Sequence, residues 1–194
     1  IKPEKYKIVP AKKLVTSSEK DAKKFFKESL ELGNEGLMFK KLDAPYKPGA
    51  RVGYMIKYKN VMETLDLVIT EATWGEGKRA SWLSSFTLSC RKGDSFVEIG
   101  KVGTGIKEKE GLTFKQLTKI LKPLIEKETG KTVILKPKIV VEIAYEEIQK
   151  SVNYSSGYAL RFPRCRKIRN DKGPKQADDL KKVEQLYKQQ RGKK

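Results

Sequence analysis

Short apolar stretches separated by glycine turns fill the middle of this chain of 194 residues. The stretches are residues 65–73, 81–91, 96–102, 133–135 and 139–143. Gly75, Gly77 and Gly93 lie in the turns that join the first three stretches. Evenly spaced strands with glycine turns are typical of a small antiparallel barrel, so this part of the chain is predicted to be mainly β.

One helix is predicted between the third and fourth of these strands. Apolar residues with helical spacing mark its buried face: Leu117, Ile120, Leu121, Leu124 and Ile125. Gly130 follows and is expected just beyond the end of the helix. Five strands with one inserted helix are the elements of an OB-fold, a barrel that often binds nucleic acids.

The first part of the chain has a different pattern, in which strands and a helix alternate. A short strand is predicted at 6–9, followed by a helix that begins at the capping residue Ser18 and ends at Gly33. Two further strands, at 35–41 and 53–59, alternate in character and are expected to pair.

The change of pattern predicts a domain boundary near Val61. We therefore expect one domain at 1–61 and an OB-fold domain at 62–194. A last helix is predicted from four apolar residues near the end of the chain, Leu180, Val183, Leu186 and Tyr187. The predicted fold class is α+β and mainly β.

The amino-acid composition limits the partners and the kinds of catalytic site that this chain can have. The chain carries 43 Lys and Arg residues against 24 Asp and Glu residues, a formal charge of +19, which suits a polyanionic partner. No histidine is present, so Ser-His-Asp triads are excluded. Cys90 and Cys165 lack the pairing that zinc requires and are expected to pack in the core. Without an apolar membrane span or a signal peptide, a cytoplasmic, nucleoid-associated protein is expected.

Two lysines on one strand form the first candidate site. Alternation places Lys57 and Lys59 on the same face, with their ammonium groups about 7 Å apart. Two such groups repel each other unless an anion lies near them, so the face is either simply solvated or binds an anion. Glu35, at the start of the neighbouring strand, is either an exposed carboxylate or a ligand for a divalent cation near that anion.

A dense group of cations near the end of the barrel forms the second candidate site. Residues 160–172 read LRFPRCRKIRNDK, with apolar residues between the arginines. Arginine binds phosphate oxygens with two parallel hydrogen bonds, whereas lysine acts as a point charge. Phe162, beside Arg161, is able to act as a wedge in a DNA groove or to fill a gap in the core.

These segments together resemble the ATP-dependent DNA ligases, in particular the archaeal replicative type. EGLMFK at 35–40 is similar to nucleotidyltransferase motif IV, YMIKYK at 54–59 to motif V, and 160–172 to motif VI. Three further segments resemble the OB domain of ligases in order and spacing: 73–78, 100–105 and 141–150.

The resemblance implies a role for each residue of the first site. Motif IV supplies a carboxylate for the catalytic Mg²⁺ or Mn²⁺, which corresponds to Glu35. Motif V supplies lysines to the α-phosphate of ATP, which correspond to Lys57 and Lys59. An arginine just upstream contacts the nucleotide and corresponds to Arg51.

The resemblance also implies phosphate and DNA contacts on the OB domain. Arg169, Asp171 and Lys172 of motif VI would orient the leaving pyrophosphate. Arg161 and Phe162 resemble the pair that contacts nicked duplex DNA. The remaining expected DNA contacts are Lys78, Arg79, Lys101, Thr104 and Arg164.

Ligases of this family seal nicks in replication, repair and recombination through lysyl-AMP and DNA-adenylate intermediates. Their nucleophile lies in a Lys-x-Asp-Gly motif, and this chain contains no Asp-Gly dipeptide. The resemblance therefore implies the end of an adenylation domain followed by an OB domain, inactive alone, with a hinge at 60–64. It implies nicked DNA as partner, a monomer without membrane contact, and a sliding clamp reached through the parent protein. The alternatives are a non-catalytic OB-fold module and a messenger-RNA capping guanylyltransferase.

Overall fold

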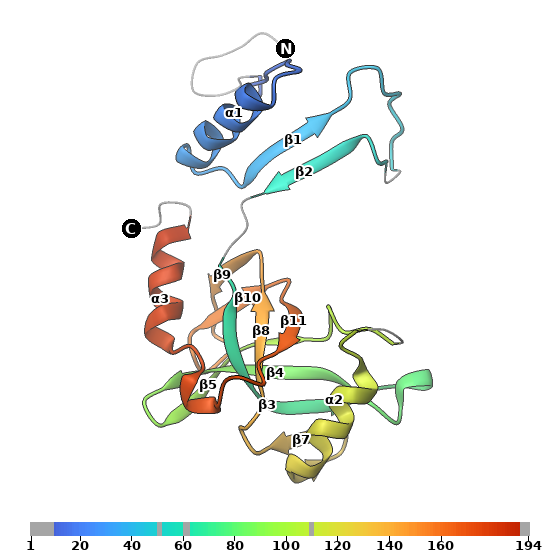
Figure 1. Cartoon of the computed structure of the whole chain (residues 1–194), viewed down its shortest axis with the longest axis vertical. Coiled ribbons are helices and arrows are strands. Elements are labelled where there is room, and N and C mark those ends of the chain that lie inside the picture. The colour runs from blue at the N-terminus through green and yellow to red at the C-terminus, as the bar shows by residue number, and fades with distance from the viewer. Residues whose placement is uncertain (1–9, 50–51, 60–62, 109–110, 191–194) are drawn as a thin grey trace. The chain divides into compact units, whose positions relative to one another are not determined.

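The computed structural model describes residues 10–49, 52–59, 63–108 and 111–190 (Figure 1). The predicted strand at 6–9, Arg51 and part of the predicted hinge at 60–64 lie outside these ranges. The chain divides into two compact units, 1–60 and 61–194, and each is described by itself. None of the helices in the described ranges has the length and apolar character that a membrane crossing requires.

The helix of the first unit, α1 (Glu19–Glu31), begins and ends where its capping residues predict. The Ser18 hydroxyl oxygen accepts the backbone N–H of Asp21 at 3.3 Å and so satisfies one of the free donors of the first turn. Gly33 lies two residues beyond the helix with φ 79°, a conformation that glycine adopts without strain.

A hairpin completes the described part of the first unit. β1 (Gly36–Lys40) pairs antiparallel with β2 (Met55–Lys59), so the predicted pairing of these strands is confirmed. The Tyr58 ring packs 4.6 Å from the Phe26 ring of α1, and the Ser29 hydroxyl of α1 donates to the first carbonyl of β1 at 2.8 Å. Ser29 is the one buried side chain among the described residues of this unit.

The second unit is built on a strongly paired antiparallel sheet. Its strands are β3 (Leu65–Trp74), β4 (Leu83–Lys92), β5 (Ser95–Val102), β6 (Ile125–Thr129), β7 (Thr132–Leu135), β8 (Val140–Ala144), β9 (Glu147–Lys150), β10 (Tyr158–Arg161) and β11 (Arg164–Ile168). Seven of them form one sheet with the order β11-β8-β3-β4-β5, and β7 joins β3 and β6. β9 and β10 form a separate hairpin. The α+β, mainly β prediction is confirmed, although the sequence pattern misses β6, β9, β10 and β11.

The inserted helix is present but shorter than predicted. α2 (Phe114–Leu121) begins at Thr113, whose side chain forms a capping box with the third residue of the helix. A 3₁₀ turn that contains a proline follows, and Ile125 is the first residue of β6, so its placement in the helix is wrong. Ile120 is 39% exposed and does not belong to the buried face. Gly130 lies in the turn between β6 and β7 and not beyond the helix.

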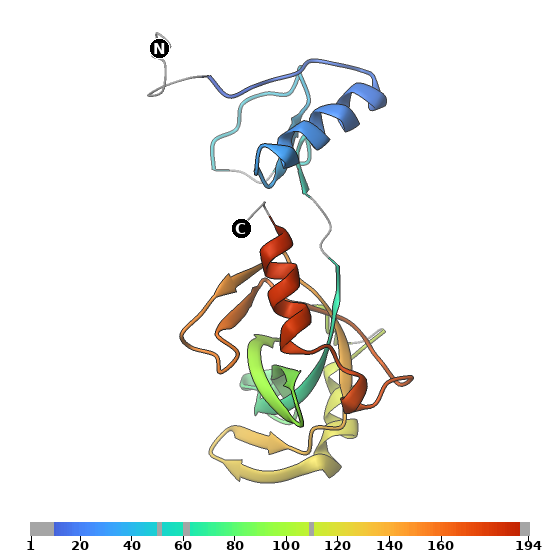
Figure 2. The same cartoon turned by 90° about the vertical axis from the view of Figure 1, so that its left-hand side faces the viewer.

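The predicted C-terminal helix is confirmed as α3 (Leu180–Gln189), which lies along the β9–β10 hairpin (Figures 1 and 2). The Tyr187 ring lies 5.3 Å from the Tyr158 ring of β10. Directly after the helix, the side-chain amide of Gln190 hydrogen-bonds both the N–H and the carbonyl of Ile148 in β9. These contacts fix the end of the described chain to the barrel.

The core of the second unit is formed by the sheet together with α2, α3 and the β9–β10 hairpin. Its fully buried members include Leu65, Leu67, Phe86, Leu88, Ile99, Leu117 and Ile143. Cys90 and Cys165 are buried free thiols in the same core, so their prediction as packing residues is confirmed. A smaller cluster of Val68, Val140 and Ala177 packs the segment that follows β11 onto the strands.

Candidate functional site

The β1–β2 register brings two of the predicted site residues together. Gly36 lies opposite Lys59, and Met38 lies opposite Lys57. Glu35 directly precedes β1, and its Oε2 lies 3.4 Å from the Lys59 ammonium nitrogen. Lys57 is exposed on the same strand face as Lys59. The first site therefore has one carboxylate beside two lysines, while Arg51 lies outside the described residues.

Close approach of the two strands explains why Gly36 follows Glu35. A Cβ atom at this position would lie 2.1 Å from the Tyr58 carbonyl oxygen, and the φ angle of 143° is one that other residues rarely adopt. The Tyr58 side chain points to the opposite face, where its ring contacts Phe26 and Phe39. The aromatic contacts thus orient the strand so that Lys57 and Lys59 face away from α1.

A strained corner carries the predicted DNA-contacting pair of the second unit. Phe162 joins β10 to β11 with φ 50°, the one positive φ among the described non-glycine residues, and it is 58% exposed. The Arg161 guanidinium lies 5.2 Å from the Phe162 ring centre, and its Nη1 is 3.5 Å from the buried carboxylate of Glu147. Backbone strain of this kind is found most often at functional sites.

A glycine loop packs against this corner and adds another predicted contact. The Thr104 hydroxyl donates to the Pro163 carbonyl at 2.6 Å, and the Thr104 carbonyl accepts the N–H of Cys165 at 2.9 Å. Gly105 is required here because a Cβ atom would lie 2.2 Å from the Cys165 carbonyl oxygen. The structure therefore brings Thr104 together with the 161–164 corner.

The other predicted DNA contacts occupy different surroundings. Arg164 and Lys101 are exposed on β11 and β5, and Lys78 is exposed in the turn after β3. The Arg79 guanidinium already has partners within the chain. It binds the Glu108 carboxylate at 2.6 and 2.9 Å and lies 4.8 Å from the Phe114 ring centre.

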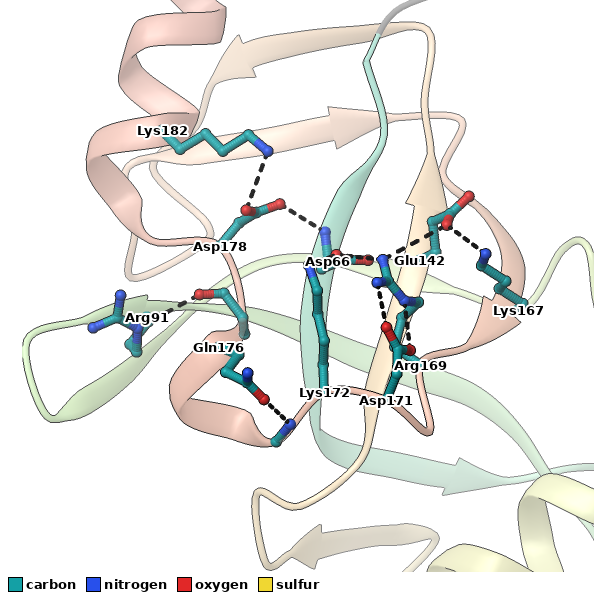
Figure 3. A network of polar contacts seen from close by, with 12 residues as sticks. Asp66, Arg91, Glu142, Lys167, Arg169, Asp171, Lys172, Gln176, Asp178 and Lys182 are labelled. Carbon is teal, nitrogen blue, oxygen red and sulfur yellow. Dashed lines mark hydrogen bonds and ion pairs between the residues drawn. The ribbon is translucent and has the colours of Figure 1, made fainter.

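The motif VI residues meet in a network of ion pairs on the outer side of β3 and β8, which Figure 3 shows. Nη1 of Arg169 and Nζ of Lys172 both bind Oδ2 of Asp66, at 2.7 and 2.6 Å. Asp171 binds the other edge of Arg169, at 2.9 Å to Nε and 2.7 Å to Nη2. Glu142, opposite Asp66 on β8, lies 3.9 Å from Arg169.

These contacts set the charge state of the network. Hydrogen bonds from Arg169 hold the pKa of the Asp171 carboxyl well below its usual value, and the same bonds raise the pKa of Arg169. Both groups are therefore charged at neutral pH. The arrangement is able to present two fixed cations to a phosphate group.

Sequence reasoning misses Asp66, the carboxylate on which this network converges. Asp66 is 7% exposed, and Asp178 binds its backbone N–H at 2.8 Å. A charged residue within the apolar run LDLVIT is the signal that would have found it, because such residues are buried only with partners. Its partners lie more than 100 positions further along the chain and are not readable from the sequence.

Known proteins match both units. A family model described as "ATP dependent DNA ligase domain" matches residues 1–59, and one described as "ATP dependent DNA ligase C terminal region" matches residues 79–172. A DNA ligase of Nanoarchaeum equitans is 54% identical over 92% of this chain, and one of Archaeoglobus fulgidus is 46% identical over 96%. The chain belongs to the ATP-dependent DNA ligase family. This membership does not favour the non-catalytic or capping-enzyme alternatives.

The chain spans about a third of the length of the curated ligases that it matches, 33% for the Nanoarchaeum protein and 34% for the Archaeoglobus protein. Among solved structures, the ligase domain from Mycobacterium tuberculosis LigD is 28% identical to it. That match has a TM-score of 0.51 and covers 78% of this chain and 50% of the ligase domain. A likeness to ligase domains agrees with an OB-fold as the second unit.

Proposed function

We propose that this chain supplies the end of the adenylation domain, at 1–61, and the OB domain, at 62–194, of a ligase that seals nicks in duplex DNA with ATP. The observation that carries the proposal is the β1–β2 hairpin of a ligase-family chain, in which Lys57 and Lys59 share one face and Glu35 lies beside Lys59. Neither a DNA-binding module nor a structural domain needs that arrangement.

Nucleotidyl transfer explains the two lysines. In each of the three transfer steps of a ligase, negative charge develops on the oxygens around a phosphorus atom. Fixed cations that face those oxygens stabilise the transition state more than the ground state. Lys57 and Lys59 would bind the α-phosphate in this way, and Arg51 would contact the nucleotide beside them.

A divalent cation fits the carboxylate of the first site. Mg²⁺ is usually held by one or two carboxylates together with substrate phosphates and water, and Mn²⁺ takes similar ligands. Glu35, whose side chain is 47% exposed, would supply one such oxygen. Within the described residues no group of three or more acidic, histidine or cysteine side chains is placed to hold a metal alone. The ion would neutralise phosphate charge when bound, and ATP would complete its coordination.

The motif VI residues would act on the leaving pyrophosphate. Arg169 and Lys172 carry the positive charge, and their 2.6–2.7 Å bonds to a single Asp66 oxygen keep them close together. Asp171 is itself an anion and repels pyrophosphate. It would therefore act indirectly, through the Arg169 guanidinium that it binds.

The 161–164 corner would bind nicked duplex DNA. Arg161 and Arg164 supply phosphate contacts, and the exposed Phe162 ring is suited to insertion beside a base step. Lys78, Arg79, Lys101 and Thr104 would extend the contact. We further propose a monomer that acts at the nucleoid in the cytoplasm, with a sliding clamp bound by the rest of the ligase.

Nick sealing by a joined protein tests the proposal. In the joined protein, this chain replaces the part of the Nanoarchaeum equitans ligase that it matches, which is 33% of that protein. Lys57→Ala is expected to abolish sealing, whereas the control Lys23→Ala, on exposed α1, is expected to leave it unchanged. Undiminished sealing by Lys57→Ala would refute the assignment of the phosphate clamp.

A further inference from the structure

Two carboxylates hold the Arg169 guanidinium from different sides, and they differ in burial. Asp66 binds Nη1, and its side chain is 9% exposed. Asp171 binds Nε and Nη2, and its side chain is 64% exposed. The Arg169 side chain itself is 19% exposed. One carboxylate therefore lies beneath the guanidinium and the other covers its outer edge.

Asp66 is fixed by its strand as well as by its side chain. Its N–H donates to the Asp178 carboxylate and its carbonyl accepts the Asp178 N–H, both at 2.8 Å. Its Oδ2 also binds Lys172, while its buried Oδ1 has no hydrogen-bond partner in the described part of the chain. Movement of this carboxylate would leave two cations without their shared anion, so Asp66 is suited to anchor them.

Asp171 lies on a tight turn, in which the Lys172 N–H donates to the Arg169 carbonyl at 3.1 Å. Its two oxygens take the Nε–Nη2 edge, one of the two edges with which arginine binds a phosphate through two parallel hydrogen bonds, and Asp66 already engages Nη1 of the other edge. A carboxylate and a phosphate cannot occupy the Nε–Nη2 edge at the same time. Rotation of an exposed side chain is sufficient to clear it.

The network is also electrically balanced. Its ion pairs join four cations, Lys167, Arg169, Lys172 and Lys182, to four anions, Asp66, Glu142, Asp171 and Asp178. Arg91, which Figure 3 also draws, pairs with one further anion, Asp179. In a chain with a formal charge of +19, the motif VI cations therefore lie in a locally neutral region. An incoming anion therefore gains little favourable electrostatic energy there until one of the carboxylates has moved away.

We propose that Asp66 is a positioning residue that anchors Arg169 and Lys172, and that Asp171 occupies the phosphate-binding edge of Arg169 until pyrophosphate displaces it. The inference rests on the proposed function, which gives these cations a pyrophosphate group to bind. No covalent bond changes: Asp171 turns to solvent, the phosphate takes its two hydrogen bonds, and Asp66 keeps Nη1.

A matched pair of variants separates the two carboxylates. Asp171→Asn and Asp66→Asn each remove one negative charge from the same network. We expect Asp171→Asn to bind inorganic pyrophosphate about three- to fivefold more tightly than the unmodified chain, because a competing surface ion pair is lost. Asp66→Asn is expected to give no such gain, because the two cations lose their anchor. Isothermal titration calorimetry on the full chain measures both, and Glu76→Gln, outside the network, measures the effect of charge alone.

Variants of Arg169 keep the test decisive where Asp66→Asn does not fold. Arg169→Lys keeps the charge but loses the two-bond edge, so the double variant Arg169→Lys with Asp171→Asn is expected to show no gain over Arg169→Lys. Equal gains for Asp171→Asn and Glu76→Gln, or no pyrophosphate binding by any variant, would overturn the proposal. A gain for Asp66→Asn as large as that for Asp171→Asn would show that Asp66 is a competitor and not an anchor.

The proposed function is tested separately by lysyl-AMP formation in the joined ligase. If Arg169→Lys leaves that reaction unchanged, the role of Arg169 in the proposed function is wrong even where the binding data follow the expected pattern. If Arg169→Lys stops the reaction but all the carboxylate variants bind pyrophosphate alike, the exchange at Arg169 is wrong and the proposed function stands.

Discussion

Replacement of Gly105 by alanine tests whether the glycine loop holds the 161–164 corner, the proposed DNA contact, in place. An alanine Cβ would lie 2.2 Å from the Cys165 carbonyl oxygen and 2.9 Å from its nitrogen, and φ at this position is +84°. The left-handed backbone costs an alanine about 1–2 kcal/mol, and the overlap with fixed backbone adds about 1–3 kcal/mol. The expected loss of unfolding free energy is therefore about 2–5 kcal/mol.

Gly130→Ala is the matched control. Its φ is +60°, but no heavy atom lies within 4 Å of the added Cβ, so only the backbone conformation contributes. The expected loss is about 1–2 kcal/mol. The difference between the two variants isolates the contact between Gly105 and Cys165.

Urea unfolding followed by tryptophan fluorescence reports on the second unit, because Trp74 and Trp82 are the two tryptophans of the chain. With a urea dependence of about 2 kcal/mol per molar, Gly105→Ala is expected to lower the midpoint by roughly 1 M or more. Fluorescence anisotropy should also show weaker binding of nicked duplex DNA, because Thr104 and the 161–164 corner are displaced together. Equal losses of stability in both variants, or unchanged DNA binding by Gly105→Ala, would refute this reasoning.

Three shorter predictions test the rest of the structure. Arg161→Ala should reduce the slope of log affinity for DNA against log salt by about 0.9, and an unchanged slope would remove this residue from the phosphate contacts. Replacement of the fully buried Leu117 by alanine should lower the free energy of unfolding, measured in urea, by about 3–5 kcal/mol. Ile120 is 39% exposed, so Ile120→Ala should lower it by less than about 1 kcal/mol. Burial raises the pKa of Cys90 and Cys165 to about 12, so iodoacetamide at pH 8.5 should label neither thiol before unfolding. Because the folded pKa values lie above the usual thiol value, the stability that these groups contribute is lost as pH rises from about 9 towards 12.

The strands of the barrel are predictable where runs of apolar residues recur along the sequence. β3, β4, β5, β7 and β8 each contain such a run and begin and end within about two residues of their predictions, although β3 and β8 bury residues on both faces. β9, β10 and β11 are only four or five residues long and contain few large aliphatic residues, and Glu147 of β9 is itself buried. Their pairing depends on contacts that a local pattern does not contain.

The end of the inserted helix shows where prediction from apolar spacing fails. Leu124 and Ile125 continue the helical spacing of the residues before them, so periodicity alone extends the helix. Pro123 lacks a backbone N–H and restricts the residue before it, and the chain leaves the helix through a 3₁₀ turn into β6. Pro123 therefore predicts the end of the helix more reliably than the apolar spacing predicts its continuation.

The candidate site is likewise predictable from the sequence only in part. Alternation along one strand places Lys57 and Lys59 on the same face from the sequence alone, whereas the position of Glu35 beside Lys59, directly before β1, follows from the pairing of β1 with β2. The placement of Arg169 and Lys172 depends on their hydrogen bonds to Asp66, which lies 103 and 106 positions away in the sequence. A pattern within one segment identifies the cations, but only the fold shows which anion holds them.

If the proposed function is right, charge balance gives the motif VI cations and the 161–164 corner different selectivity. A chain with a formal charge of +19 attracts DNA along much of its surface, so cations reserved for a nucleotide must be kept from binding the DNA backbone. The motif VI cations meet this need because Asp66, Asp171 and Glu142 surround them with negative charge. The 161–164 corner has the opposite character, with an exposed aromatic ring and an exposed Arg164. Duplex DNA is therefore expected to bind first at the corner, and motif VI is expected to respond only to an anion able to displace Asp171.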